Sequence, residues 1–347
     1  MRQTELLISL TNLKNNLQII KSKTSSDIQA VIKANAYGLG YEEVVETIES
    51  DVESFAVITI DEAIGLRKHT KKPIVLLQGV HEVADYEQVE KYNLDFVIHA
   101  DWQIENLSNF YLDESRIWLK LNTGMNRLGF NADDFEIYFD KLSSFRAKDL
   151  IIMSHLAASS EPTNKLNNSQ IKLFNEITAG KTNRKSLANS GAIFNFPNAH
   201  FDIVRPGIAI YGGKYLENGL KPVSKLRSKV ISLRKVKRGE SIGYDGAWTA
   251  DKDCIICYAP IGYADGIPYS SFNRKININE KEFSIIGKIN MDLIAINLEN
   301  DESIKEGDWV DFWGFDHDLT ELSNDFKTIS YQLMTNLSGR VEKNYLK

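Results

Sequence analysis

A single lysine stands at the end of a short apolar run near the N-terminus. Residues 28–32 read Ile-Gln-Ala-Val-Ile, and Lys33 follows directly, before the glycine-containing turn at residues 37–40. Apolar runs of this length between turn signals are typical of buried strands. Burial lowers the pKa of a lysine amine, and such an amine can react with a carbonyl compound. Lys33 is therefore a candidate for covalent chemistry, with a structural salt bridge as the alternative.

Further candidate residues lie at the ends of apolar runs or after them. The polar ones are Lys120, Arg127, His155, Asn189, Ser190 and Arg205, and Gly207 and Ile208 follow the last of these. The turn at Ser190 opens a helical pattern, where backbone N–H groups and a hydroxyl can bind an anion. Taken alone, each residue could have a purely structural role: a histidine is often hydrogen-bonded within the fold, and an arginine is often exposed to solvent. Their joint placement after successive runs favours a binding site for a phosphate.

The elements that position these residues alternate between strands and helices. The predicted strands cover residues 28–32, 55–59, 74–78, 94–99, 116–121, 150–154, 186–189 and 202–205. Between most of them lie segments with apolar residues at helical spacing, such as 41–50 and 61–69. Alternation of this kind indicates parallel strands, and eight units favour a closed (β/α)8 barrel of the TIM type. In that fold, functional groups collect at the carboxyl ends of the strands.

The pattern changes after about residue 218. Predicted strands cover residues 228–236, 254–261, 274–278, 283–289, 293–298 and 308–313, and a helical pattern returns only near 330–336. We therefore expect an α/β chain with two domains. A barrel occupies residues 1–218, and a mostly β domain occupies residues 219–347.

Composition excludes several classes of function. The 347 residues carry a net charge of −6 without a basic stripe, which argues against nucleic-acid binding. No apolar run approaches the roughly 20 residues of a membrane span, and the N-terminus does not resemble a secretory signal. Cys254 and Cys257 lie in a strand-like run without nearby metal-ligand spacing, so we expect buried structural thiols and no metal. A cytoplasmic location is the expectation.

Seven motifs together resemble the alanine racemase family, in the order of that family, over residues 8–331. In the first domain they lie at residues 31–38, 119–129, 188–191 and 204–212, and in the second at 242–246, 260–266 and 287–292. The resemblance implies that Lys33 binds pyridoxal phosphate covalently. When substrate frees it, Lys33 is the base on one face of the α-carbon, and Tyr244 of a second subunit is the acid or base on the other face.

The resemblance also assigns the remaining residues. Arg205 would bond the pyridine nitrogen with support from His155, and Arg127 would contact the phenolic oxygen and the substrate carboxylate. Met291 would offer a backbone N–H to that carboxylate, and Lys120 matches a position that is carbamylated in some members. The cofactor-binding set is Lys33, Tyr37, Arg127, His155, Asn189, Ser190, Arg205, Gly207, Ile208 and Tyr331, of which Tyr37, Ser190, Ile208 and Tyr331 bind the phosphate.

The resemblance implies a homodimer with shared active sites that interconverts L- and D-alanine and supplies D-alanine for peptidoglycan. The chain departs from the family pattern at Asn122, Ser160, Tyr269, Lys288 and Asn290. Because these positions match the substrate entrance, a racemase for serine or a basic amino acid remains an alternative. A decarboxylase of the same architecture and a pyridoxal-phosphate carrier without enzymatic activity are the less favoured alternatives.

Overall fold

The computed structural model describes residues 3–315 and 319–347, which form two compact units. The barrel unit contains residues 14–36 and 40–210, and the β unit contains the described residues of 1–13, 37–39 and 211–347. The sequence predicts a first domain over residues 1–218. In the structure, the described residues up to Leu13 belong to the β unit, because the strand at Thr4–Ser9 pairs with strands from the second half of the chain.

The barrel unit is built around an eight-stranded parallel sheet in the order β8-β7-β6-β5-β4-β3-β2-β9. Its strands are β2 (Asp27–Val31), β3 (Ser54–Val57), β4 (Ile74–Leu76), β5 (Asp95–Ile98), β6 (Arg116–Lys120), β7 (Asp149–Met153), β8 (Lys185–Ser186) and β9 (Ile203–Val204). The two end strands meet where Arg205 N donates to Ala188 O at 2.9 Å, beside an isolated bridge between Asn189 and Arg205. The predicted TIM-type barrel is confirmed, with a strand at each of the eight predicted places.

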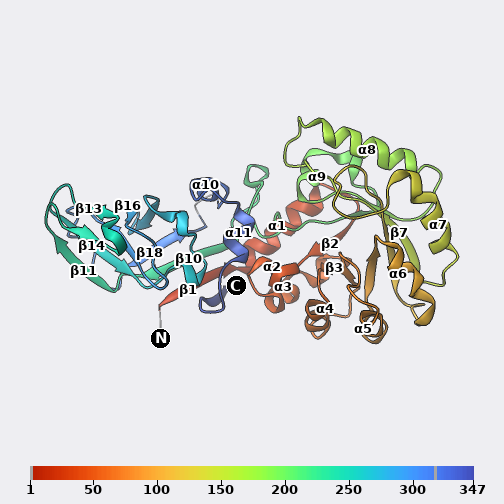
Figure 1. The fold of residues 1–347 in the computed structure, drawn as a ribbon, viewed down its shortest axis with the longest axis horizontal. Helices are drawn as coiled ribbons and strands as arrows, with labels where there is room; N and C mark the ends of the chain where they lie inside the picture. The colour runs from red at the N-terminus through yellow and green to blue at the C-terminus, as the bar shows by residue number, and fades with distance from the viewer. Residues whose placement is uncertain (1–2, 316–318) are drawn as a thin grey trace. The chain divides into compact units, whose positions relative to one another are not determined.

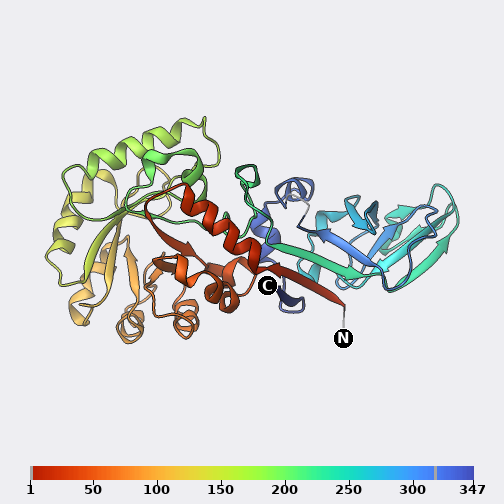
Figure 2. The same cartoon turned by 180° about the vertical axis from the view of Figure 1, so that it is seen from behind.

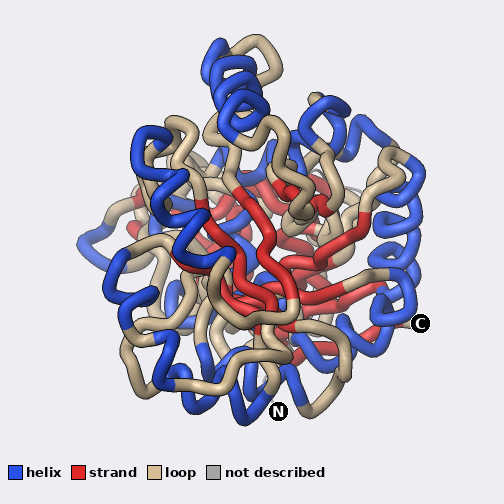
Figure 3. The backbone as a smooth tube through the Cα atoms, turned by 90° about the vertical axis from the view of Figure 1, so that its right-hand side faces the viewer, coloured by secondary structure: helices blue, strands red, loops and turns tan. Residues whose placement is uncertain are grey.

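Helices surround the strands of the barrel unit, as Figure 1 and the end-on view of Figure 3 show. The helices of the chain up to β9 are α1 (Leu10–Ser22), α2 (Lys33–Tyr37), α3 (Tyr41–Ile48), α4 (Ile60–Arg67), α5 (Asp85–Tyr92), α6 (Asp101–Glu105), α7 (Phe135–Ser143), α8 (Lys165–Ile177) and α9 (Ser190–Asn195). The strands β3, β4, β5 and β6 are buried along their whole length. This burial on both faces is what a parallel sheet covered by helices requires.

The β unit contains a nine-stranded sheet in the order β11-β14-β17-β16-β15-β18-β10-β1-β19. Its strands are β1 (Thr4–Ser9), β10 (Ser224–Lys229), β11 (Ser232–Val236), β14 (Cys254–Ala259), β15 (Lys275–Ile278), β16 (Lys281–Ile286), β17 (Ile294–Asn297), β18 (Trp309–Trp313) and β19 (Glu342–Leu346). The red N-terminal strand can be followed into this sheet in Figure 2. A two-stranded ribbon of β12 (Ser241–Ile242) and β13 (Trp248–Thr249) and the helices α10 (Leu319–Asp325) and α11 (Ser330–Thr335) complete the unit.

Two features of the β unit differ from the sequence expectation. The single strand predicted over residues 228–236 is two strands, because the chain leaves β10 at Val230 and enters β11 at Ser232 to pair with a different neighbour. The strands β1, β12, β13 and β19 were not predicted, and neither was α10, which precedes the helical pattern expected near 330–336. The alternating burial of Thr4, Leu6 and Ile8 is the signal that reveals the first of them.

Cys254 and Cys257 are free thiols buried in β14. Burial raises the pKa of the Cys257 thiol to about 12. Within residues 3–315 and 319–347, none of the helices has the length and apolar character that crossing a bilayer requires.

Candidate active site

Lys33 lies where β2 ends, on a backbone turn of unusual conformation. Ala34, Asn35 and Ala36, which follow it in α2, have φ values of 51°, 54° and 54°. Left-handed backbone costs about 1–2 kcal/mol per residue for side chains other than glycine, so surrounding bonds must maintain this turn. Two of these bonds are Ala36 N to Ile32 O at 2.9 Å and Gly40 N to Asn35 O at 2.9 Å. The turn fixes the direction in which the lysine leaves the strand.

The barrel unit brings five basic side chains into electrostatic contact. They are Lys33, Lys120, Arg127, His155 and Arg205. Burial and then the Arg127 charge lower the pKa of Lys33. Burial, Arg205, Arg127 and Lys33, in that order, lower the pKa of Lys120 to about 8. This cationic cluster has the charge that an anionic cofactor or a substrate carboxylate requires.

Arg205 is buried and bonds to the ends of two neighbouring strands. Its guanidinium donates to Ser154 O at 2.5 Å, to Leu187 O at 3.4 Å and to the Ser186 hydroxyl. Burial lowers its pKa to about 10, so the guanidinium stays charged at neutral pH. Since these bonds leave few ways for the side chain to rotate, the arginine is a fixed cation beside the ends of β7 and β8.

His155 is the neutral member of the cationic cluster. Burial is the largest cause that holds its pKa well below the usual range, and the charges of Arg205, Arg127, Lys120 and Lys33 act in the same direction. Its Nε2 lies 3.3 Å from the Asn189 amide nitrogen. The histidine therefore packs beside the cations without adding to their charge at neutral pH.

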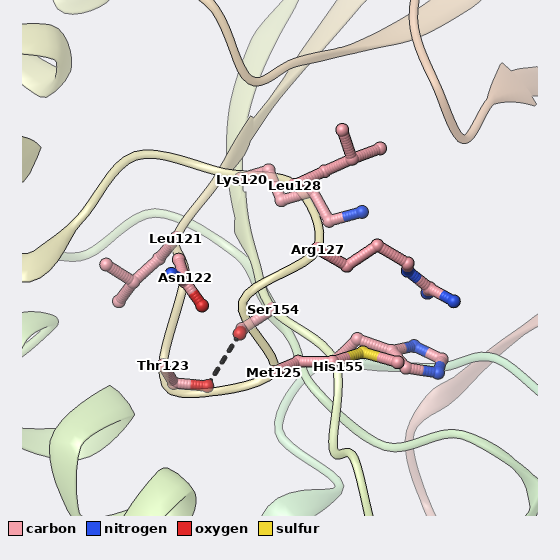
Figure 4. A pocket seen from close by; sticks show the side chains of 9 residues that line it. All are labelled: Lys120, Leu121, Asn122, Thr123, Met125, Arg127, Leu128, Ser154 and His155. Carbon is pink, nitrogen blue, oxygen red and sulfur yellow. Dashed lines mark hydrogen bonds between the residues drawn. The ribbon is translucent and has the colours of Figure 1, made fainter.

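A pocket lies between the ends of β6 and β7 (Figure 4). Its lining comprises Lys120, Leu121, Asn122, Thr123, Met125, Arg127, Leu128, Ser154 and His155. The Arg127 guanidinium and the His155 ring extend to the same side of it. Asn122 orders the loop that carries Arg127, because its Oδ1 accepts Gly124 N and Asn126 N, each at 3.1 Å. Its amide also donates to Asn131 Oδ1 at 3.1 Å, which an aspartate at this position could not do.

A buried glutamine supports this pocket, and the sequence analysis did not identify it. Gln170 of α8 donates to Thr123 Oγ1 at 3.1 Å and to His155 O at 3.0 Å, and accepts from Ala157 N at 2.9 Å. Thr123 and Ser154 share a hydrogen bond of 2.8 Å. A polar residue on the apolar face of a predicted helix is the signal that could have identified it. Gln170 lies on the same face of α8 as Asn167 and Phe174, and all three side chains are fully buried.

Ser190 and Gly207 meet where the seventh and eighth strands of the barrel end. Asn189 caps α9 by accepting Ala192 N at 3.2 Å, and Ser190 follows with its side chain buried. The Ser190 hydroxyl accepts Gly207 N at 2.9 Å, and Ile208 is also buried. A hydroxyl and several backbone N–H groups thus lie together in the region where barrels of this type often bind phosphate.

Two further predicted residues, Tyr37 and Tyr331, are neighbours within the β unit. The ring centroid of Tyr37 lies 6.1 Å from that of Tyr331 and 4.7 Å from that of Tyr211. Burial raises the pKa of both predicted tyrosines above the usual range, so their hydroxyls keep their protons at neutral pH. Gly38 has a φ of +85°, and a Cβ there would lie 2.2 Å from Met334 O. The absence of a side chain at Gly38 therefore allows the segment after Tyr37 to pack closely against α11.

Tyr244 and Met291 are exposed on the β unit. Tyr244 is 68% exposed and Met291 is 53% exposed. Asn290 O and Met291 O accept Tyr263 N and Ala264 N, both at 3.1 Å, so the backbone beside Met291 is fixed. Lys288 forms an ion pair with Asp245, the residue after Tyr244. Both side chains are therefore exposed on the surface of the β unit.

The comparisons with known proteins agree along the whole chain. The family models for the alanine racemase N-terminal and C-terminal domains match residues 8–215 and 223–345. The chain is 35% identical to an alanine racemase of Mannheimia succiniciproducens, covering 100% of both chains. It is similar to the crystal structure of biosynthetic alanine racemase from Pseudomonas aeruginosa, with a TM-score of 0.96, 33% identity and 100% coverage of both chains. An alanine racemase from Bartonella henselae with covalently bound pyridoxal phosphate matches with a TM-score of 0.92 and 29% identity, again over 100% of both chains.

Proposed function

The chain belongs to the alanine racemase family, and on that premise we propose that it interconverts L- and D-alanine with pyridoxal phosphate as cofactor. The observation that carries the proposal is the Lys33 amine. It lies at the end of a barrel strand beside Arg127, and burial lowers its pKa. We further propose that its role is to supply D-alanine for peptidoglycan, as the name of a biosynthetic relative supports.

The donor groups proposed for the cofactor fit its chemistry. Bound pyridoxal phosphate supplies an electron sink that acidifies the α-proton of an amino acid. Lys33 would hold the cofactor covalently, Arg205 would donate to its ring nitrogen, and Arg127 would contact its phenolic oxygen. The residues proposed for the phosphate are Tyr37, Ser190, Gly207, Ile208 and Tyr331, with Asn189 and His155 beside them. Two observations support this assignment: Ser190 accepts a hydrogen bond from Gly207 N, and the rings of Tyr37 and Tyr331 are neighbours.

Two proton-transfer groups on opposite faces of the α-carbon are needed for racemisation. We assign Lys33 Nζ to one face and Tyr244 Oη to the other. Because the pKa of Lys33 is lowered, a larger fraction of the free amine is neutral near pH 7 and can accept a proton. Arg205 keeps its proton at this pH, so it donates to its partners without taking part in the transfer.

The substrate carboxylate is proposed to bind between Arg127 and the backbone N–H of Met291. Lys120 is proposed to carry a carbamate, formed when its neutral amine adds carbon dioxide and releases a proton. Two observations support this modification. The side chain is buried among the Arg205, Arg127 and Lys33 charges, and its pKa of about 8 provides neutral amine near physiological pH. The resulting negative charge would offset the neighbouring cations.

The functional protein is proposed to be a homodimer in which residues 219–347 of each chain complete the site of its partner. Support comes from large apolar side chains that the β unit exposes: Tyr244, Tyr263, Tyr269, Phe272, Met291 and Ile329. A two-fold arrangement would give two equivalent sites. A cytoplasmic location is proposed as well, since both cysteines are free thiols.

The proposal is tested by α-proton exchange of L-alanine in D2O with the purified protein and pyridoxal phosphate, followed by chiral analysis of the product. Deuterated D-alanine is expected. A racemase for other amino acids is the second candidate, because Lys288 and Ser160 depart from the family at the entrance and Lys288 pairs with Asp245 of its own chain. Exchange of serine or lysine without exchange of alanine would favour that candidate. No exchange with any amino acid would contradict both.

A further inference from the structure

Glu62 lies in the first turn of α4 and forms a capping box with Thr59, the residue before that helix. Its backbone N–H donates to Thr59 Oγ1 at 3.2 Å, and its Oε2 accepts Thr59 N at 3.3 Å and Ile58 N at 2.9 Å. Capping boxes satisfy the N–H groups that a helix start leaves without partners. One carboxylate oxygen completes this task, so the second is available for a different contact.

The second oxygen of Glu62 reaches the turn that carries Lys33. Glu62 Oε1 accepts the backbone N–H of Ala34 at 2.6 Å. Ala34 follows Lys33 directly and is the first residue of the left-handed turn, with φ 51° and ψ 48°. A single carboxylate therefore joins the start of α4 to the point where the chain turns after β2. A short, charge-assisted bond of this kind stabilises backbone more than a neutral one does.

We propose that Glu62 is a positioning residue for Lys33, which maintains the turn after the lysine and places a negative charge against the cationic cluster. The inference rests on the proposed role of Lys33 in cofactor binding and proton transfer. It adds a residue that none of the sequence motifs contained.

The charges around Lys33 give this carboxylate an electrostatic role. Burial and Arg127 lower the pKa of Lys33, and the Glu62 charge raises it. Lys33 in turn helps to lower the pKa values of Lys120 and His155. Loss of the Glu62 charge therefore lowers the pKa of Lys33 further, because an opposing charge no longer stabilises the protonated amine.

The alternative is that Glu62 does no more than cap α4. The chain offers two controls for this. Thr59→Ala removes the hydroxyl of the same capping box and keeps the carboxylate. Asp85→Asn alters a carboxylate of another barrel loop, where Asp85 Oδ2 accepts His81 N at 2.7 Å and Glu82 N at 3.2 Å.

The experiment compares Glu62→Gln with both controls in the full-length holoenzyme. The first readout is the rate at which the visible absorbance of bound cofactor is lost after dilution. The second is the pH profile of kcat in each direction of racemisation, which reports groups of the enzyme–substrate complex. An amide has one acceptor oxygen, so Glu62→Gln loses the charge and one of the two links.

We expect Glu62→Gln to release cofactor about tenfold faster, and to move the acid limb of kcat about 0.5–1 pH unit lower in the direction in which Lys33 accepts the proton. In the opposite direction Lys33 must hold the proton that it donates, so the basic limb of kcat is expected to move lower there by a similar amount. Both controls are expected to keep the wild-type profile. Glu62→Asp keeps the charge on a shorter side chain, so its acid limb is expected to stay at the wild-type pH while release is faster.

Identical release rates and profiles for Glu62→Gln and Thr59→Ala would overturn the inference. A shift of the acid limb in Glu62→Asp as large as in Glu62→Gln would contradict the electrostatic part. Failure of the proposed function gives a different result, because the wild-type protein itself would then bind no cofactor or racemise no amino acid.

Discussion

The hydroxyl of Ser190 accepts the backbone N–H of Gly207 at 2.9 Å, although the two residues follow different strands of the barrel. This bond brings a side-chain hydroxyl and the N–H groups of a second loop to one place, where the proposed phosphate binds. It also means that the serine has a structural partner in addition to its proposed ligand.

We therefore predict that Ser190→Ala weakens both cofactor retention and folding. Removing the hydroxyl leaves the Gly207 N–H without this acceptor, which costs about 1–3 kcal/mol when the group is buried. Cofactor loss after dilution is expected to be about tenfold faster than in the wild type. Ser22→Ala is the control, because that hydroxyl bonds Ile19 O at the exposed end of α1. Equal cofactor loss in the two variants would contradict the assignment.

Lys33→Ala is predicted to remove the visible absorbance of bound cofactor completely, because the variant has no amine at the end of β2. The circular dichroism spectrum is expected to remain that of the wild type. Lys68→Ala, at the exposed end of α4, is the matched control and is expected to keep the absorbance. A band of wild-type intensity in Lys33→Ala would show that another amine holds the cofactor.

Carbamylation of Lys120 is predicted to depend on pH. Its pKa is lowered from 10.5 to about 8, so the neutral amine that reacts with carbon dioxide becomes the main form as pH rises through about 8. Occupancy should therefore rise between about pH 7 and 9 at constant dissolved carbon dioxide. Native mass spectrometry or 13C NMR with labelled bicarbonate measures it. The same occupancy in a Lys120→Ala variant would place the modification elsewhere.

Gln170→Leu is predicted to destabilise the barrel unit. The leucine removes an amide that bonds Thr123, His155 O and Ala157 N, all within a buried part of the pocket wall. Leaving these groups unsatisfied costs about 2–4 kcal/mol in the free energy of unfolding, measured by urea denaturation. Gln18→Leu, on the exposed face of α1, is expected to change it by less than about 0.5 kcal/mol. A similar effect of both variants would mean that the Gln170 network contributes no stability.

Sequence patterns predicted the barrel well, because each strand is a short apolar run bounded by turn residues and followed by a helical pattern. Strand β8 was the least distinct of these. The prediction covers residues 186–189, whereas the strand in the structure is Lys185–Ser186. The N-terminal strand β1 was missed since its partners, β10 and β19, lie more than 200 residues away in the sequence. Local patterns carry no information about such pairing.

The residues of the candidate site also fall into a group that sequence patterns predicted and a group that they did not. Lys33 and His155 directly follow predicted strands, and Lys120 and Arg205 lie at the carboxyl ends of two others, so the fold alone placed all four at one end of the barrel. Gln170 and Glu62 act through bonds between different loops, and a sequence motif does not reveal which backbone N–H groups a side chain reaches. The left-handed turn after Lys33 was also not predictable, because two of its residues, Ala34 and Ala36, do not favour this conformation and Asn35 between them is only a weak signal for it.

A shared active site leads to a prediction for mixed dimers. Lys33→Ala and Tyr244→Phe subunits are each expected to be inactive, and mixing them should restore activity because one of the two sites in each heterodimer then has both residues intact. Random exchange of subunits makes half of the dimers mixed, so about a quarter of the wild-type activity should return. No recovery after verified subunit exchange would contradict a site shared between chains.

The measurement that tests the central claim most directly is α-proton exchange of separate L- and D-alanine samples in D2O by Tyr244→Phe, with cofactor absorbance recorded on the same sample. With Lys33 acting on one face and Tyr244 on the other, the variant is predicted to keep its absorbance, to exchange the proton of one enantiomer only, and to form almost none of the other. Normal racemisation of both enantiomers by this variant would contradict the two-base assignment.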